Sequence, residues 1–598
     1  MSNIVVYRLF FCYSMIMVSS SLKKFFIWLY TVLCAAIVFS LLCMSFSFDV
    51  SLFALPVSLL FSAVMVYYSF ILRRNNDIRA IPVIRKMLQY LPYVMLASFV
   101  LRRAGKYGTH YWYDVVTVIL WCIVFIGSFP VSYYMNEKRI ILLKKEWVSQ
   151  EKKNPHKKLH GGAWILFEAV DWIDALVQAV FMVLLIQIFI VQLYVIPSES
   201  MVPQFLIKDR VIVFKTASGP KFPLSNVGIP CLRNYKRGDI VVFRNPHYSM
   251  DRKSEVKTVT SQLVYMLTFM AVNLNKDADG QPKADPLVKR VAGVPGEQLV
   301  MQDGILYART KNSSGFEPVE KDASFAAWNL NSVEASSKRN IKTFPLTQTQ
   351  YDMMLTCEKD RRDLDMNAAA AECSGLSRQF YKLVPDKTGR MSSDGISMFE
   401  YDLFVNYDAF TQKLMSADGG SWWFEQFMTD WIKNKPAEGI YAGGDIYSDA
   451  NYRLNVMIKL CLGHIILRNA ELIHEGITAE NRRNDVQLYG YMEQAEKLNF
   501  YVMILDQRNM PVFPENTSGG VAQYIPDNCY FMMGDNRFNS LDMRHSYIQT
   551  MTQLTRYDKY SVTYESIMAP QFVNRKYILG TTVFRFWPVN RIGALKSE

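Results

Sequence analysis

The sequence predicts a membrane anchor of several helices, followed by a domain of strands and turns that carries a large inserted lobe. Three observations support this fold class. Half of the 598 residues are hydrophobic, but the apolar residues concentrate before residue 196. Several apolar runs there approach the roughly 20 residues that a helix needs to cross a bilayer. Beyond residue 196, polar turns alternate with short segments rich in β-branched residues, which is typical of strands.

The long apolar runs are flanked by basic residues. Membrane spans are expected at residues 25–46, 51–72, 114–135 and 175–195. An earlier apolar run at 4–19 contains Arg8. This run fits a short anchor, a signal-like segment or an over-long start of the chain, and these alternatives stay open.

A further apolar run, residues 87–101, is only 15 residues long, which is short for a span. The loop at 136–160 holds eight Lys/Arg against three Glu, and such loops lie in the cytoplasm. The first two expected spans form a hairpin whose basic ends both face the cytoplasm. With 114–135 as a span, the loop at 136–160 therefore reaches the cytoplasm only if 87–101 also crosses. We therefore expect five crossings.

The last expected span, residues 175–195, contains no charged residue and would extend about 31 Å as a helix, enough for a bilayer core of roughly 30 Å. On the expected topology it leaves the cytoplasm and delivers Ser198 and Ser200 to the outer surface. A serine-rich exit is most often a solvated helix end, so this stretch alone does not indicate a reaction.

The rest of the chain mixes strands and helices. Strands that follow polar turns are expected at 209–214 and 237–243, with a last one from 578. Residues 263–274 would make only about 18 Å of helix, too short to span, so a helix lying on the membrane or on the domain is expected. Helical periodicity marks 347–370 and 451–474, inside an inserted lobe at 298–524.

Charge and cysteine content narrow the class of protein. The net charge is +12, but the basic residues cluster beside apolar spans, so membrane topology explains them better than nucleic acid does. The nine cysteines form no CxxC pair and no zinc spacing. Cys461 and His464 resemble half a metal site, but a core cysteine is the simpler reading. Cys357 and Cys373 are expected to form a disulfide.

The chemistry centres on serine and lysine. A serine nucleophile needs a base within hydrogen-bond reach and donors for the developing oxyanion. Lysine is a base only when neutral, so burial must lower its pKa by roughly 2 to 3 pH units from about 10.4. Lys289 offers such a setting, because it alternates with Leu287 and neighbours Val288 and Val291 on an expected strand. Taken alone, Lys289 is more simply a strand-edge lysine.

Four ordered stretches resemble the motifs of bacterial type I signal peptidases. They are residues 198–203 (SESMVP), 237–243 (RGDIVVF), 289–296 (KRVAGVPG) and 534–544 (GDNRFNSLDMR). Their order and their position after the last apolar span also match. The resemblance covers about 195–297 and 525–595.

The resemblance implies roles for the first and third motifs. Ser200 is similar to the family's nucleophile and Lys289 to its general base. The Ser198 hydroxyl resembles the group that joins the backbone N–H of Ser200 in the oxyanion hole.

It also implies roles for residues around this pair. Ser540 resembles the hydroxyl that orients the lysine, and Asp542 and Arg544 resemble the supporting pair beside it. Ile196 and Val288 match positions that line the pocket for small substrate side chains.

The resemblance completes the expected fold class: a multi-span α-helical membrane anchor followed by a mostly antiparallel β extracytoplasmic catalytic domain with a large α+β insertion. It implies a serine endopeptidase of the cytoplasmic membrane that uses no cofactor and no metal. The expected partners are exported preproteins with Ala-x-Ala-like cleavage sites, the lipid bilayer and, as a further candidate, the export translocon, with no nucleic acid. The expected domains are 1–174, 175–195, 196–297, 298–524 and 525–598.

The fourth motif departs from the family pattern. Phe538 stands where an acidic residue is usual, and Met543 where a small one is common. His545-Ser546-Tyr547 replaces an aromatic-glycine ending. These departures affect the local shape of the motif, not the Ser/Lys pair.

Three rivals to this interpretation remain open. The first is a catalytically inactive signal-peptidase-like scaffold or receptor. The second is a self-cleaving repressor with Ser/Lys chemistry, which the membrane spans disfavour. The third is a Ser/His/Asp triad drawn from Ser540, His545 and Asp535 or Asp542.

Overall fold

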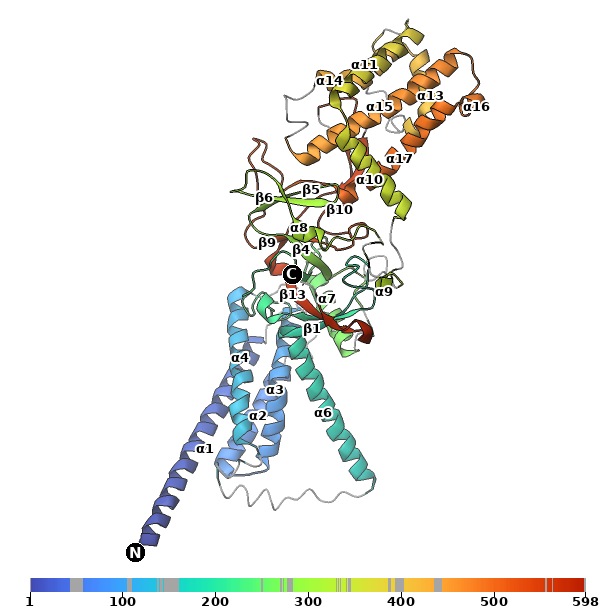
Figure 1. Ribbon diagram of the computed structural model, residues 1–598. Helices are drawn as coiled ribbons and strands as arrows, with labels where there is room; N and C mark the ends of the chain where they lie inside the picture. The colour runs from blue at the N-terminus through green and yellow to red at the C-terminus, as the bar shows by residue number, and fades with distance from the viewer. Residues whose placement is uncertain are drawn as a thin grey trace. The chain divides into compact units, whose positions relative to one another are not determined.

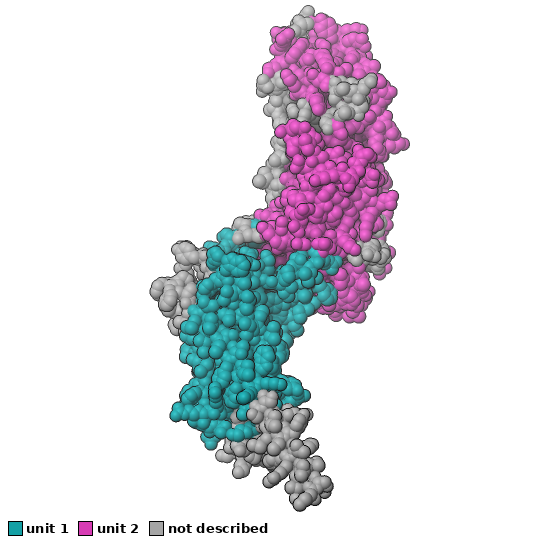
Figure 2. Space-filling model, turned by 90° about the vertical axis from the view of Figure 1, so that its left-hand side faces the viewer, with its two compact units in different colours: residues 1–193, 213–233, 248–284 teal, residues 194–212, 234–247, 285–598 magenta. Residues whose placement is uncertain are grey.

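The structure is a computed structural model that divides into two compact units. It describes residues 2–43, 57–104, 110–136, 139, 143–144, 161–248, 251–268, 271–272, 274–276, 283–329, 331, 333, 335–339, 341, 346–385, 389–392, 403–434, 444–553, 557–561 and 563–595. Unit 1 comprises residues 1–193, 213–233 and 248–284, and unit 2 comprises 194–212, 234–247 and 285–598 (Figure 2).

Unit 1 is built from long apolar helices (Figure 1). They are α1 (Ser2–Cys43), α2 (Val57–Asn75), α3 (Ala80–Arg103), α4 (Tyr111–Tyr134) and α6 (Gly162–Phe189), with the shorter α7 (Arg252–Leu267). Buried side chains such as Phe25, Phe39 and Leu88 form the core of the first four. Four described helical segments are long and apolar enough to cross a membrane: Ser21–Cys43, Val57–Asn75, Tyr111–Tyr134 and Trp164–Phe189.

The short crossing expected at 87–101, the third in chain order, belongs to the longer helix α3. This helix has 24 residues, but it includes Arg85 and Lys86 and ends in Arg102 and Arg103. It is therefore not among the four apolar segments found in the described part of the chain. The basic loop at 136–160 lies almost entirely outside the described residues.

Two expected helices have different bounds. The span expected at 175–195 is wrong at both ends, because α6 runs from Gly162 to Phe189 and residues Val191–Val195 form strand β1. Hydropathy alone does not separate an apolar helix end from a short strand of Val, Leu and Tyr. The helix expected at 263–274 begins earlier, at Arg252, and ends at Leu267.

The large sheet has eight strands in the order β1-β2-β13-β3-β4-β9-β12, with β14 beside β13, and most of its residues belong to unit 2. Its strands are β2 (Arg210–Phe214), β3 (Ile240–Phe243), β4 (Leu287–Gly293), β9 (Cys529–Met533), β12 (Val573–Asn574), β13 (Ile578–Trp587) and β14 (Gly593–Ala594). The described registers are antiparallel, as expected. The expected strands at 209–214, 237–243 and from 578 are confirmed.

Two smaller sheets also belong to unit 2. One has the order β7-β6-β5-β8, formed by Glu317–Pro318, Ile305–Thr310, Glu297–Gln302 and Met510–Phe513. The other is the hairpin of β10 (His545–Gln553) and β11 (Thr563–Met568). This hairpin directly follows the fourth motif.

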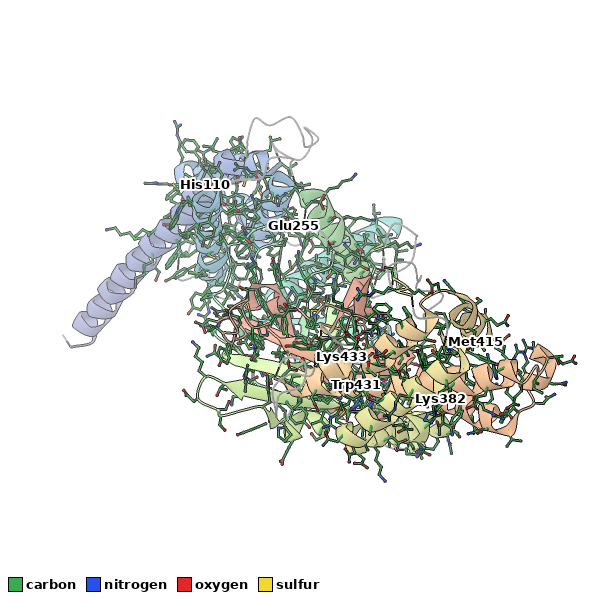
Figure 3. All side chains as sticks on the ribbon, turned by 90° about the horizontal axis from the view of Figure 1, so that it is seen from above. His110, Glu255, Lys382, Met415, Trp431 and Lys433 are labelled. Carbon is green, nitrogen blue, oxygen red and sulfur yellow. The ribbon has the colours of Figure 1, made fainter. Side chains whose placement is uncertain are left out.

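Between β7 and β8 the chain forms a helical lobe. Its helices are α8 (Glu320–Ala323), α9 (Ala335–Lys338), α10 (Gln348–Asp363), α11 (Met366–Leu383), α13 (Leu403–Ser416), α14 (Gly420–Lys433), α15 (Ile446–His474), α16 (Ala479–Arg482) and α17 (Val486–Arg508). Trp431 of α14 is buried among them, whereas Lys433 is exposed. Both residues are labelled in Figure 3. The helix expected at 451–474 is confirmed within α15. The periodicity at 347–370 covers two helices, because Asp365 caps α11 by accepting from the backbone N–H groups of Asn367 and Ala368.

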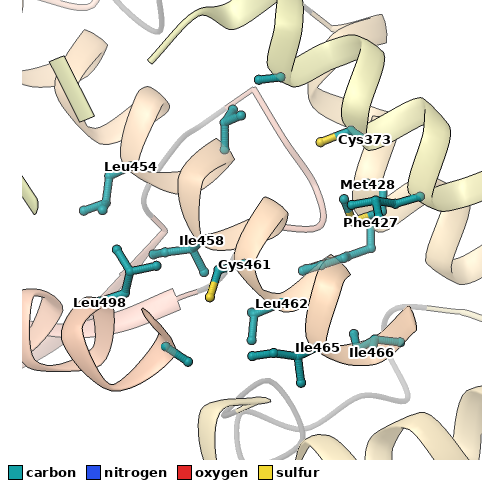
Figure 4. Packing of buried hydrophobic residues seen from close by; sticks show 14 of the residues in the cluster. Cys373, Phe427, Met428, Leu454, Ile458, Cys461, Leu462, Ile465, Ile466 and Leu498 are labelled. Carbon is teal, nitrogen blue, oxygen red and sulfur yellow. The ribbon is translucent and has the colours of Figure 1, made fainter. Parts of the chain in front are cut away.

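The lobe core contains three buried cysteines. Cys461 packs with Ile458, Leu462 and Leu498 (Figure 4), which makes it a core residue. The disulfide expected between Cys357 and Cys373 is wrong, since both thiols are free and sit on different helices. The Cys357 thiol donates instead to the Lys497 carbonyl at 3.8 Å.

Candidate active site

The segment after β1 folds into a tight turn that presents two serines. Ile196 is fixed by bonds between its N–H and the Asp209 carbonyl (2.8 Å) and between its carbonyl and the Lys208 N–H (2.9 Å). Within the turn, the Val202 N–H donates to the Glu199 carbonyl at 3.1 Å. Ser198 is exposed and Ser200 half-buried, and their hydroxyl oxygens lie 3.4 Å apart. The first motif therefore places both hydroxyls at one point of the surface.

Lys289 lies on β4, between β3 and β9 in the large sheet, and it is opposite Val241 of β3. Its side chain is only 3% exposed. Burial lowers the pKa of Lys289 from 10.5 to about 8, while the charges of Asp542 and Asp535 oppose this shift and that of Arg544 supports it. A substantial fraction of this lysine is therefore neutral slightly above neutral pH, as a general base requires.

Gly534, the first residue of the fourth motif, lies close to the serine turn of the first motif. Arg290 pairs with Met533 across β4 and β9, so the continued antiparallel register sets Lys289 opposite Gly534. A Cβ atom at Gly534 would overlap the Ser540 hydroxyl and lie 2.5 Å from the Ser200 carbonyl oxygen. Only glycine permits this close approach. The structure thus brings the Ser200 carbonyl and the Ser540 hydroxyl against Gly534, whereas no hydrogen bond between described residues joins the Lys289 amine to either serine.

Two bonds hold the serine turn to the fourth motif. The Asn536 N–H donates to the Ser200 carbonyl at 3.2 Å. The Asn536 side-chain amide donates to the Glu199 carbonyl at 3.1 Å.

The Ser540 hydroxyl is buried and has no hydrogen-bond partner among the described residues. It is thus available to a lysine amine that approaches it.

Asp542 and Arg544 form a buried pair beside this point. The Arg544 guanidinium donates to both Asp542 carboxylate oxygens at 2.9 and 3.2 Å, and the Gly534 N–H donates to the same carboxylate at 2.8 Å. Burial would raise the pKa of Asp542, but Arg544 outweighs it and holds that pKa well below its usual range. Asp542 is therefore an anion that ties the turn at Gly534 to Arg544.

A second buried pair joins three of the four motifs. Arg290 donates to both carboxylate oxygens of Asp535 at 2.8 and 2.6 Å, and to the Gly238 carbonyl at 2.8 Å. The pair ties Arg290, which follows Lys289, to Asp535, which follows Gly534. It therefore holds the lysine strand in register with the fourth motif.

Sequence reasoning missed the residues that cover this cluster. Asp322 of α8 accepts two bonds from Arg537 at 2.9 and 2.7 Å, and the Arg290 guanidinium lies 3.7 Å from the ring centre of Phe325. The Ala327 N–H donates to the Asp535 carbonyl at 2.8 Å. These residues carry no local signal, since Asp322 and Arg537 are 215 positions apart.

The rival Ser/His/Asp triad is not assembled. His545 is buried, and neither of its ring nitrogens has a hydrogen-bond partner among the described residues. Burial, with help from Arg544, lowers the pKa of His545 to about 4. Neither Ser540 nor Asp542 nor Asp535 bonds to the ring within the described part of the chain.

The two expected pocket residues lie close to the candidate serine and lysine in the sequence. Ile196 is buried two residues before Ser198, and Val288 is half-buried beside Lys289, opposite Val242. Their role toward substrate stays a prediction.

Comparison with known proteins gives consistent matches. A family model described as signal peptidase, peptidase S26, matches residues 169–360 and 469–587, together more than half of the chain. Signal peptidase I of Buchnera aphidicola subsp. Schizaphis graminum is 39% identical over 79 residues, 13% of this chain and 25% of the relative. Signal peptidase I P of Bacillus subtilis subsp. natto is 24% identical over 163 residues, 27% and 63% respectively. Signal peptidase I of Bacillus licheniformis is 27% identical over 144 residues, 24% and 52%. The chain thus spans between a quarter and just under two thirds of these relatives.

Proposed function

The chain belongs to the signal peptidase family, peptidase S26, and on that premise we propose that it is a membrane-bound serine endopeptidase that removes N-terminal signal peptides from exported preproteins. Ser200 is the nucleophile and Lys289 the general base. The observation that carries this proposal is the burial of Lys289, with its pKa lowered to about 8, beside the residue that contacts Ser200 and Ser540.

Acylation begins with neutral Lys289. Its amine takes the Ser200 hydroxyl proton while the serine oxygen attacks the scissile carbonyl carbon. The negative charge on the carbonyl oxygen is stabilised by the Ser198 hydroxyl and the backbone N–H of Ser200. The lysine ammonium then gives its proton to the leaving amine. The peptide bond breaks, and an ester with Ser200 remains.

Deacylation repeats these roles with water. Neutral Lys289 takes a proton from water, and the hydroxide attacks the ester carbon. Collapse of the intermediate returns the proton to Ser200 and releases the carboxylate end of the signal peptide. The Ser540 hydroxyl is suited to orient the Lys289 amine, and the Asp542–Arg544 pair holds the turn that carries Ser540.

The four apolar helical segments support a place in the membrane. We propose a multi-pass protein of the cytoplasmic membrane in which α3 crosses as well, with residues 136–160 in the cytoplasm and residues 197–598 outside it. This topology brings the Ser200 turn to the face where exported preproteins emerge.

The activity is tested with purified protein in detergent and a preprotein, the cleavage site being read by mass spectrometry. Ser200→Ala and Lys289→Ala should each abolish cleavage, and the double variant should lose little more, because the two residues act as a unit. Ser314→Ala and Lys311→Ala, at exposed positions of the same unit, are matched controls and should keep full activity. Turnover by a folded Ser200→Ala or Lys289→Ala protein contradicts the dyad. An inactive wild-type protein would favour the scaffold.

The topology has its own test. Protease added to intact spheroplasts should digest the region beyond residue 300 and leave the loop at 136–160 uncut. Protection of the region beyond 300 would contradict the proposed orientation.

A further inference from the structure

The helical lobe contacts the support pair directly. Arg544 donates through one guanidinium nitrogen to the Gln507 carbonyl at 2.8 Å, and through another to the Arg537 carbonyl at 3.0 Å. Gln507 is the penultimate residue of α17. Carbonyls in the last turn of a helix lack intrahelical partners and carry the negative end of its dipole. The end of α17 is thus a suitable acceptor for a buried cation.

The end of α17 is itself fixed by a second buried ion pair. Arg508, the last residue of the helix, donates to both oxygens of Glu358 on α10 at 2.6 and 3.0 Å, and to the Asp303 carbonyl at 2.6 Å. The side chains of Arg508 and Glu358 are 5% and 2% exposed. The Gly304 N–H in turn donates to the Arg508 carbonyl at 2.8 Å. Gln507 is therefore tied to the adjoining sheet and to α10.

We propose that α17 is a positioning element for the reaction: the Glu358–Arg508 pair holds the Gln507 carbonyl in place, and that carbonyl orients Arg544 against Asp542. Glu358 and Arg508 are then positioning residues. This inference rests on the proposed peptidase function.

The chain of contacts has a defined consequence for the base. Arg544 bonds Asp542, Asp542 bonds the Gly534 N–H, and Gly534 contacts Ser540 and Ser200. The charges that act on Lys289 are those of Asp542, Arg544 and Asp535. If Arg544 moves away, its lowering effect on the Lys289 pKa weakens while that of Asp542 in the opposite direction persists. The lysine then needs a higher pH to become neutral.

The test compares Glu358→Gln with the wild-type protein. The variant removes the charge that holds Arg508 but keeps the size of the side chain. It should lower kcat about tenfold, the effect of weakening one hydrogen bond to a charged group, and leave KM within about twofold. The acid limb of its pH profile should move to higher pH, and amide hydrogen exchange in residues 534–544 should be faster.

Asp449→Asn is the matched control, because it removes the same charge from the half-exposed Arg453–Asp449 pair on α15 of the same lobe. It should change neither kcat, nor the acid limb, nor exchange in residues 534–544. Arg508→Lys keeps the charge but loses the bidentate geometry, so it should give an intermediate effect.

A folded Glu358→Gln protein with the wild-type kcat, acid limb and exchange would overturn the inference, as would an equal effect of Asp449→Asn. If both Glu358→Gln and Arg508→Lys unfold, the Glu358–Arg508 pair serves the stability of the fold alone, and the inference is overturned as well. If the wild-type protein cleaves no preprotein, the proposed function fails, but the exchange comparison still tests the positioning role.

Discussion

The activity should rise with pH in a way that identifies the base. With a pKa of about 8, Lys289 is about 1% neutral at pH 6, about 10% at pH 7, half at pH 8 and about 90% at pH 9. If neutral Lys289 is required, kcat/KM should rise about tenfold from pH 6 to pH 7 and about fivefold from pH 7 to pH 8, and it should level off above pH 9. An unshifted lysine, at 10.5, would still be rising at pH 10.

The assay is steady-state cleavage of a preprotein in detergent between pH 6 and pH 10 at constant ionic strength, with the fold checked by circular dichroism at each pH. His545→Ala is the companion variant and should keep most of the rate and the same profile. A histidine base with the pKa of His545, about 4, would give a rate that is flat over this range.

Three results would refute the reasoning. The first is a flat wild-type profile between pH 6 and pH 9, which would exclude a base with a pKa near 8. The second is a limb that rises without levelling up to pH 10, which would show that burial does not shift Lys289. The third is a folded His545→Ala protein that loses about a thousandfold in rate while Lys289→Ala survives.

Three further predictions concern stability and thiol chemistry. Lys289→Met should raise the free energy of unfolding at pH 7 by up to about 3 kcal/mol. The reason is that Lys289 has a pKa of about 8 in the folded protein and 10.5 in the unfolded chain, so protonation favours the unfolded chain. Thermal unfolding should show that this gain shrinks as the pH rises from 8 towards 10.5. Lys459→Met should lower the free energy of unfolding by about 3 to 5 kcal/mol, because it removes the ammonium that lies 2.7 Å from the buried Asp558 carboxylate. Lys459→Met combined with Asp558→Asn should recover much of the loss. Cys357 and Cys373 should both react with maleimide in denaturant without reductant, but not in the native protein, since both are free and buried; a bridged peptide in non-reducing mapping would contradict this.

The parts of the fold that could be predicted are those with a local signal. Strands β2 and β3 follow polar turns and consist mainly of β-branched residues, so composition located them in the sequence. The four motifs are also local, and they identified the residues around Gly534 before their contacts were known. Motif order could not give the register that sets Lys289 opposite Gly534, because that register depends on pairs such as Arg290 with Met533.

The errors have a different physical origin. Residues 175–195 form one apolar run, but a helix and a strand share it, and the boundary depends on pairing within the large sheet, which hydropathy does not report. The same limit applies to Cys357 and Cys373. They are close in sequence, but Asp365 caps a new helix between them. Closeness in sequence therefore did not predict that the two thiols lie on different helices.

The departure at Phe538 shows how the lobe and the fourth motif fit together. Phe538 is 8% exposed, belongs to the same apolar cluster as the lobe helices, and meets the Trp328 ring edge-on at 5.1 Å between ring centres. An acidic residue here would lose its water without a partner in this apolar cluster, which is costly. The neighbouring Arg537 is already paired with Asp322. The departure from the family pattern at Phe538 is therefore explained by packing against the helical lobe.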